Sequence, residues 1–472
     1  MKKNLTVSIS LIAILVFAGV ARAGVEVAVR FPETSVGKRA ESYFSAFNSS
    51  NENEMRTYLE QNIAPSNLKE RPIEERMAVY RQLKSDLATL EPVKILKQST
   101  DAIKLVARSA KESWLELTFE FEKSAPYKLL GIRIMRLAEP PDLNAPTIPI
   151  TEAEMLKEIE TFMEGITVED SFSGVVLLAK GEEPIFRKAY GLASKEYNVP
   201  NRVDTRFNLG SINKFLTRIA IEQLEGKGEL RFEDPIGKYL TDYPNKEAAD
   251  KVTIRHLLDM TSGIGDFFGE RYQSTPKDRI RTLSDYLLLF GDEPLLFEPG
   301  TNRQYSNGGY IVLGLIIEKV SGQTYFDYVR DHIYKIAGMG NTAHLEADMP
   351  AENVASGYTN NWDENDHPPG EPRRNNIYTR PARGSSAGGG YSTVDDLLKL
   401  VVALKKNEIL ALKTSEEINK AGIAIVGGAP GINAQVETNP ETDYVIIVLS
   451  NYDPPTAGKV ARKINSFLER LK

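Results

Sequence analysis

The chain has 472 residues, more than one average domain, which favours two or three domains. Its formal net charge of −7 argues against a nucleic-acid-binding protein. The absence of cysteine excludes thiol nucleophiles, disulfides and thiolate metal sites.

The first 23 residues have the layout of a secretory signal peptide. Lys2 and Lys3 precede an apolar run over residues 11–20, and Ala21-Arg22-Ala23 supplies a cleavage site. The alternative is a short membrane anchor, although a lipoprotein anchor is excluded because no cysteine follows. No other stretch approaches the roughly 18 apolar residues that a membrane span needs. We expect a mature chain that starts near Gly24, has no membrane span and is periplasmic or secreted.

Residues 33–137 predict a small α+β accessory domain. Helical patterns cover 38–47, 52–62 and 74–90, and strand-like runs cover 93–98, 102–110, 114–120 and 129–136. Helices followed by a meander predict a helix packed on an antiparallel sheet, loosely similar to cystatin-like and nuclear-transport-factor-like domains. Such a domain either carries a pocket or serves as a spacer.

Residues 138–150 contain four prolines and predict a linker, which leaves 151–472 as a second domain. A helix is expected over 151–165, strands over 174–179, 184–190 and 444–450, and a closing helix over 459–471. Mainly helical patterns and long loops lie between these ends, including a polar loop over 360–386. We therefore expect a sheet built from both ends of the domain, with a helical region inserted between them.

Ser211 and Lys214 form a candidate nucleophile and base. Ser211 opens a segment with one apolar helical face, which Gly226 ends. Side chains three residues apart on a helix are neighbours. A serine hydroxyl needs a base to remove its proton, and burial lowers the pKa of a lysine enough for that role. The start of a helix also favours negative charge on Ser211.

The spacing alone is weak evidence, because S-x-x-K occurs four times, starting at Ser35, Ser66, Ser211 and Ser274. For any one of them the alternative is a surface serine that caps a helix. Only Ser211 precedes an apolar helix that can be buried, which singles it out.

Tyr305-Ser306-Asn307 lies on a tight loop before an apolar helix over 310–320. A phenol near a lysine ammonium is expected to have a lowered pKa and to transfer protons. Asn307 is expected to orient both a substrate amide and Lys214. The alternative is a capping loop with a buried tyrosine, because the same spacing recurs at Tyr243 and Tyr358.

Together these residues resemble the serine β-lactamase and penicillin-binding-protein family. Over 165–472 further landmarks follow in the family's order: 229–240, 253–263, Pro299-Gly300, Tyr305-Ser306-Asn307, Gly338-Met339-Gly340 and 387–397. The chain is similar to class C β-lactamases, D-alanyl-D-alanine carboxypeptidases and related esterases. The resemblance implies an α/β (α+β) β-lactamase-like fold, an antiparallel sheet with an inserted helical region, preceded by the small cystatin-like α+β domain.

The third family motif is where the chain departs. The family places Lys-Thr-Gly or His-x-Gly on a strand lining the site, and the matching stretch here is Ile425-Val426-Gly427-Gly428. By this alignment the backbone N–H groups of Ser211 and Gly428 form the oxyanion hole, which needs no side chain at 425. A basic residue there would bind a substrate carboxylate, so we expect weaker activity on penicillins and D-Ala-D-Ala peptides than on simple esters.

The resemblance thus implies an exported serine hydrolase that acts through an acyl-enzyme on a small-molecule or peptide acyl substrate. Ser211, Lys214 and Tyr305 are the expected catalytic residues; Asn307, Ile425, Gly427 and Gly428 are expected at the substrate. No metal or cofactor is implied. One rival is an inactive protein that binds peptides, cell-wall fragments or a partner. Another rival is an α/β-hydrolase whose nucleophile motif is Gly384-Ser385-Ser386-Ala387-Gly388. A flexible glycine-rich loop is the better interpretation of this segment. The oligomeric state is left open.

Overall fold

The computed structural model describes residues 29–49, 51–137, 148–361 and 372–471. The predicted signal peptide, residues 1–23, and most of the predicted linker lie outside the described residues. The chain divides between Pro146 and Thr147 into two compact units, an N-terminal and a C-terminal unit. Among the described helices, none is long and apolar enough to cross a membrane.

The N-terminal unit consists of helices followed by a four-stranded antiparallel sheet. Its elements are α1 (Ser35–Asn48), α2 (Glu52–Asn62), α3 (Pro65–Glu70), α4 (Ile73–Leu87), β1 (Leu90–Gln98), β2 (Ala102–Ser109), β3 (Trp114–Phe121) and β4 (Leu129–Leu137). The strands pair in chain order. On β3, Leu115, Leu117 and Phe119 point to one face and are buried, as the alternation of a half-covered strand requires. That face packs against Phe44 and Phe47 of α1.

The C-terminal unit begins with α5 (Glu152–Val168), which Thr151 and Glu154 start with a capping box. The other helices are η1 (Gly210–Ile212), α6 (Asn213–Gly226), η2 (Ile236–Lys238), α7 (Lys246–Lys251), α8 (Ile254–Leu258), α9 (Glu270–Ser274), η3 (Lys277–Arg279), α10 (Leu283–Leu287), α11 (Asn307–Ser321), α12 (Tyr325–Val329), η4 (Arg330–Tyr334), η5 (Asn376–Tyr378), α13 (Val394–Lys405), α14 (Leu412–Ala421) and α15 (Thr456–Leu468). The strands are β5 (Gly174–Lys180), β6 (Glu183–Tyr190), β7 (Leu192–Ser194), β8 (Val199–Pro200), β9 (Phe207–Asn208), β10 (Tyr358–Thr359), β11 (Arg374–Asn375), β12 (Tyr391–Ser392), β13 (Ala424–Ala429), β14 (Ile432–Asn439) and β15 (Tyr444–Ser450).

The main sheet confirms the prediction that both ends of this unit build it. Its order is β13-β14-β15-β5-β6, and every neighbouring pair is antiparallel. Strands β5 and β15 are central and carry buried side chains on both faces. Strand β13 forms one edge of the sheet.

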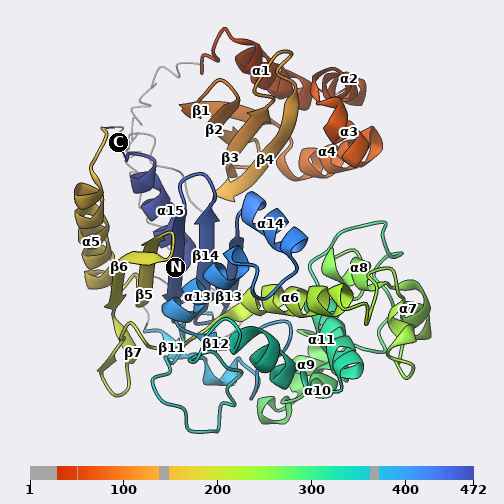
Figure 1. Cartoon of the computed structure of the whole chain (residues 1–472), viewed down its shortest axis with the longest axis vertical. Helices are drawn as coiled ribbons and strands as arrows, with labels where there is room; N and C mark the ends of the chain where they lie inside the picture. Colours follow the sequence, from red (N-terminus) through yellow and green to blue (C-terminus); the bar gives the residue numbers. More distant parts are fainter. Residues whose placement is uncertain (1–28, 50, 138–147, 362–371, 472) are drawn as a thin grey trace, which may run out of the picture. The chain divides into compact units, whose positions relative to one another are not determined.

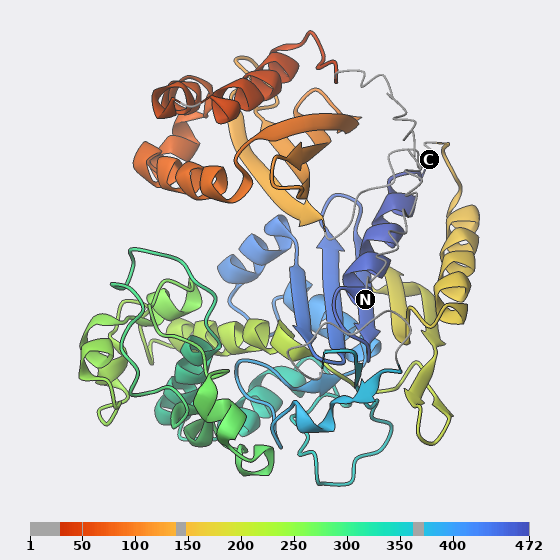
Figure 2. The same cartoon turned by 180° about the vertical axis from the view of Figure 1, so that it is seen from behind.

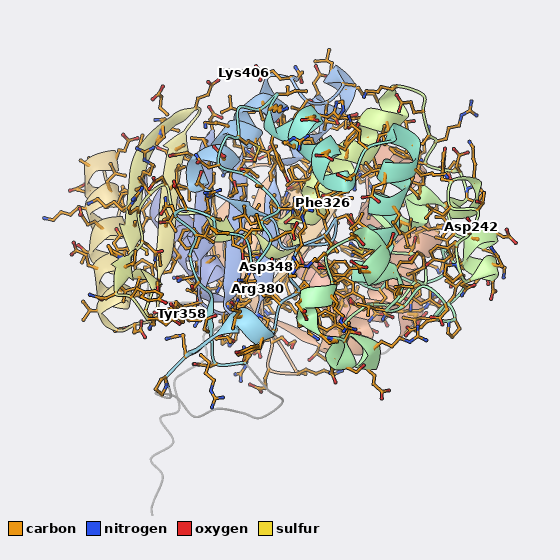
Figure 3. All side chains as sticks on the ribbon, turned by 90° about the horizontal axis from the view of Figure 1, so that it is seen from below. Asp242, Phe326, Asp348, Tyr358, Arg380 and Lys406 are labelled. Carbon is orange, nitrogen blue, oxygen red and sulfur yellow. The ribbon has the colours of Figure 1, made fainter. Side chains whose placement is uncertain are left out.

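The two faces of the sheet pack against different layers. Helices α5 and α15 cover one face, where Val176 and Val448 are buried (Figure 1). The other face, with Leu177 and Ile447, packs into the larger core shared with α6, α11 and α13. Seen from behind in Figure 2, the inserted helical region from α6 to α11 extends to one side of the sheet. Figure 3 places Tyr358 and Asp242 on opposite sides of this unit, with packed side chains between them.

Some predicted boundaries were wrong. The helix predicted over 74–90 ends at Leu87, because Ala88 has a positive φ of 62° that stops the helix before β1. The loop predicted over 360–386 contains β11, which pairs with β10, and the turn η5. Ser211 does not begin an α-helix directly: it lies on the 3₁₀ turn η1, which leads into α6.

Candidate active site

Ser211 lies on η1, at the point where the chain enters the buried helix α6. Gly210, just before it, has a φ of +50°, a conformation that favours glycine. Ile212, Leu216 and Ile219 are almost fully buried in the main core. This apolar side fixes α6 and carries Lys214, three residues after Ser211, into the interior, where it is only 6% exposed.

Three oxygen atoms surround the ammonium group of Lys214. Its Nζ donates to Ser211 Oγ at 3.2 Å, to Asn307 Oδ1 at 2.6 Å and to the carbonyl oxygen of Ala387 at 2.6 Å. The rings of Tyr305 and Tyr310 lie 4.8 and 5.6 Å from the same atom. The side chain is therefore enclosed by hydrogen-bond acceptors and aromatic rings.

Burial lowers the pKa of Lys214 to about 7, because desolvation disfavours the charged amine. The negative charge of Asp266 acts in the opposite direction and raises this pKa. Near neutral pH a substantial fraction of Lys214 is thus a neutral amine, which can accept the proton of a serine.

Tyr305 contacts the same serine from the other side. Its hydroxyl donates to Ser211 Oγ at 2.7 Å, although the residue as a whole is 54% exposed. The predicted lowering of its pKa is wrong. Loss of water around the hydroxyl raises the pKa of Tyr305, and Asp266 adds to this. The expectation assumed a charged lysine, whereas burial favours the neutral amine.

Asn307 joins Lys214 to a carboxylate. Its Oδ1 accepts from Lys214, and its Nδ2 donates to Asp266 Oδ2 at 2.6 Å. Its backbone N–H also reaches Asp266 Oδ2, at 3.3 Å. The neighbouring Ser306 caps α11 and donates to the carbonyl of Gly265 at 2.8 Å. Two side chains of the Tyr305-Ser306-Asn307 loop are therefore tied to the 265–266 segment.

Strand β13 runs against η1 with backbone touching backbone. A Cβ on Gly427 would lie 1.8 Å from the carbonyl oxygen of Leu209 and 3.1 Å from the N atom of Ser211, so only glycine fits there. Asn433 Nδ2 donates to the Gly427 carbonyl at 2.9 Å. Because N–H and C=O point in opposite directions across a trans peptide, the Gly428 N–H points away from Asn433. Gly210 lies beside this N–H, since a Cβ on Gly210 would be 2.8 Å from the Gly428 N atom.

Ile425 lies on the same strand, two residues before Gly427. It pairs with Val436 and packs, half-buried, against the main core. Residues i and i+2 of a strand share a face, so Ile425 is on the face that carries Gly427 against η1. The structure thus brings Ser211, Lys214, Tyr305, Asn307 and Gly427-Gly428 together. It places the apolar side chain of Ile425 on the strand position where the family resemblance has a lysine or histidine.

The residues 384–388 do not form a second nucleophile site. Ser386 is fully buried, and its hydroxyl donates to the Tyr310 carbonyl at 2.7 Å. The expectation of a flexible loop is wrong, since Ser385 and Gly388 exchange backbone hydrogen bonds and the segment is packed. The segment 384–388 contributes to the site through the backbone carbonyl of Ala387, which accepts a hydrogen bond from Lys214.

Two groups of the site were not identified from the sequence, the backbone carbonyl of Ala387 and the side chain of Asp266. The carbonyl of Ala387 has no side-chain signature. Asp266 follows the landmark Thr261-Ser262-Gly263 by only three residues, and an acidic residue so close to this landmark was the signal that could have identified it.

Known proteins resemble more than half of the chain. A penicillin-binding protein of Bacillus subtilis (strain 168) is 29% identical over 301 residues, which are 61% of this chain and 65% of that protein's length. Esterase EstB of Burkholderia gladioli is 28% identical over 289 residues, covering 54% of this chain and 72% of the esterase.

Solved structures show the same fold. A penicillin-binding protein from Bacillus halodurans is 31% identical, with a TM-score of 0.58 over 64% of this chain and 98% of that one. The D-amino acid amidase from Ochrobactrum anthropi SV3 shares the fold at 23% identity, with a TM-score of 0.55 over 66% of this chain and 97% of that one. The family model described as Beta-lactamase matches residues 157–469. The chain therefore belongs to the β-lactamase family of serine hydrolases.

Proposed function

We propose that this chain is an exported hydrolase that cleaves acyl substrates through a covalent acyl-enzyme on Ser211. The observation that carries the proposal is the position of Ser211 Oγ, between the Tyr305 hydroxyl at 2.7 Å and the buried amine of Lys214 at 3.2 Å. A nucleophile within reach of a base with a pKa of about 7 is the arrangement that acyl transfer requires near neutral pH.

The geometry supports a definite sequence of proton transfers. Neutral Lys214 takes the proton of Ser211 as Oγ attacks the acyl carbonyl, and the oxyanion accepts from the N–H groups of Ser211 and Gly428. Tyr305, a neutral phenol because its pKa is raised, gives its proton to the leaving group and recovers one from Lys214. Water then attacks the acyl-enzyme, loses a proton by the same route and releases the acid and free Ser211.

The substrate class follows from Ile425. An apolar side chain at this position cannot form the ion pair that holds a substrate carboxylate, whereas an uncharged ester or amide needs no such partner. The similarity to an esterase and to penicillin-binding proteins is consistent with both substrate classes. We therefore favour simple esters over β-lactams and D-Ala-D-Ala peptides.

The alternative is a catalytically inactive protein that binds peptides, cell-wall fragments or a protein partner. Ile425 is the observation in its favour, since it replaces a residue of the third family motif. The lowered pKa of Lys214 argues against it, because a binding protein has no need for a desolvated base.

Replacing Ser211 or Lys214 tests the acyl-enzyme. In Ser211→Ala, nitrophenyl ester hydrolysis should fall by about 10³-fold or more, and labelling by a fluorophosphonate probe should be lost. In Lys214→Arg, hydrolysis of the nitrophenyl ester should be abolished, since a guanidinium does not give up its proton. For the wild type, kcat/KM should rise with pH through about 7 as Lys214 becomes neutral. Ser274→Ala, which alters another S-x-x-K serine, is the matched control. A wild type that hydrolyses no ester and is not labelled would favour the binding protein.

Gly427→Ala tests the oxyanion hole. Its methyl group would push β13 away from the Leu209 carbonyl and displace the Gly428 N–H. We expect kcat to fall by about 10²- to 10³-fold, the loss typical for one oxyanion donor. Val426→Ala, which changes an exposed side chain on the same strand, should retain wild-type rates and provides the control. Equal rates for Gly427→Ala and wild type would show that β13 does not contribute a donor.

Ile425→Lys tests the substrate class. Restoring a cation should improve kcat/KM for a chromogenic cephalosporin and a D-Ala-D-Ala peptide by about 10- to 100-fold relative to a nitrophenyl ester. Ile425→Met, of similar volume and no charge, should keep the ester preference. The idea fails if the wild type already cleaves the cephalosporin far faster than the ester.

Export is tested by fractionation. The pattern of Lys2, Lys3 and the Ala21-Arg22-Ala23 site supports removal of a leader. Expressed from its full sequence in a bacterium, the protein should appear outside the cytoplasm with an N-terminus near Gly24. Replacing Ala21 and Ala23 by Lys should block processing. Recovery of the unaltered protein only in the cytoplasm and uncleaved would contradict export.

A further inference from the structure

We propose that Asp266 is a positioning residue of the reaction: by holding the amide of Asn307 in one orientation, it directs the lone pair of neutral Lys214 at Ser211 Oγ. The inference rests on the proposed acyl-enzyme function. It assigns a role to a carboxylate outside the three family motifs.

The first step is the orientation of the Asn307 amide. A carboxylate only accepts hydrogen bonds, so the group facing Asp266 Oδ2 at 2.6 Å must be the NH₂ of Asn307. The carbonyl oxygen of the amide then faces Lys214 Nζ, at 2.6 Å. Without the carboxylate, the amide could rotate by half a turn and present its NH₂ to the lysine.

The second step concerns the hydrogen atoms of a neutral Lys214. A neutral amine has two N–H groups and one lone pair. Asn307 Oδ1 and the Ala387 carbonyl, each 2.6 Å from Nζ, accept the two N–H groups. The third neighbour is Ser211 Oγ at 3.2 Å, so the lone pair is left facing the serine proton. A rotated amide would instead donate to that lone pair and compete with Ser211.

Asp266 itself is fixed by the backbone of its surroundings. Its Oδ1 accepts from the Phe268 N–H at 3.1 Å, and its Oδ2 accepts from the Asn307 N–H at 3.3 Å. Ser306 joins the same two segments through the Gly265 carbonyl. Gly308 permits the close approach, since a Cβ there would lie 2.5 Å from that carbonyl oxygen. The carboxylate is therefore held in place.

The effect of Asp266 on the pKa of Lys214 can be distinguished from that of the other titratable groups nearby. Tyr305 and Tyr310 have raised pKa values, about 12 for Tyr310, and both are neutral at pH 7. Further along α6, Arg218 pairs with Glu222 at 2.7 Å. The negative charge that raises the pKa of Lys214 is that of Asp266. Removing it should lower this pKa, which moves the acid limb of the rate profile to lower pH.

Asp266→Asn and Asp266→Ala test the proposal with a nitrophenyl ester. Both should move the acid limb of kcat/KM to lower pH. At the plateau, Asp266→Asn should lose only about 3- to 10-fold, because its amide can still accept from Asn307, whereas Asp266→Ala should lose about 10- to 100-fold. Asp292→Asn, which removes a carboxylate of a surface pair with Arg271, should change neither quantity and is the control.

A measurement without turnover separates this inference from the proposed function. Carbon-13-labelled lysine gives an NMR titration of Lys214, assigned by its absence in Lys214→Arg. The pKa should be lower in Asp266→Asn than in wild type, and thermal melting checks that each variant is folded. An unchanged acid limb and NMR pKa in folded variants would overturn the role of Asp266, because a purely structural loss lowers the rate without moving them. If the NMR pKa of Lys214 is lowered but the protein shows no Ser211-dependent turnover, the effect of Asp266 on Lys214 stands and the proposed hydrolase function fails.

Discussion

The desolvation of one amine is the interaction on which the site depends. A lysine in water is protonated at neutral pH and cannot take a proton from serine, so the fold must remove water from Lys214. The apolar side of α6 does this by anchoring the helix in the main core. An unpaired buried amine would be costly, and the carbonyls of Asn307 and Ala387 offset that cost without restoring a full negative charge beside it.

The same environment separates the acid from the base. Desolvation favours the neutral form of both groups, so it lowers the pKa of Lys214 and raises that of Tyr305. In the proposed mechanism, two groups that contact one oxygen atom thereby take opposite roles: Lys214 accepts a proton and Tyr305 donates one. Asp266 contacts Asn307 rather than the serine, and its negative charge raises both pKa values, so it opposes the shift of Lys214 and adds to that of Tyr305.

Much of this arrangement could be predicted from the sequence, and the failures have physical causes. Apolar runs predicted the central strands over 174–179 and 444–450, because burial on both faces leaves a strong pattern in the sequence. The S-x-x-K tetrad was singled out by the apolar helix behind it. Local spacing contains no information on how water is excluded in three dimensions, and this is why the shift of Tyr305 was predicted with the wrong sign. The Ala387 carbonyl belongs to the backbone and leaves no trace in residue identities.

The construction of the sheet from both ends of its unit also constrains the order in which the molecule can assemble. Ser450 on β15 donates to the carbonyl of Ser173, 277 residues earlier in the chain. Closing so long a loop carries a large entropic cost, and pairings of such high sequence separation slow folding. The turn η1 with Ser211 emerges from the ribosome long before β13, which carries Gly428, the second donor of the proposed oxyanion hole. Under the proposed mechanism, the active site is therefore complete only after β13 has been synthesised and has paired with the sheet.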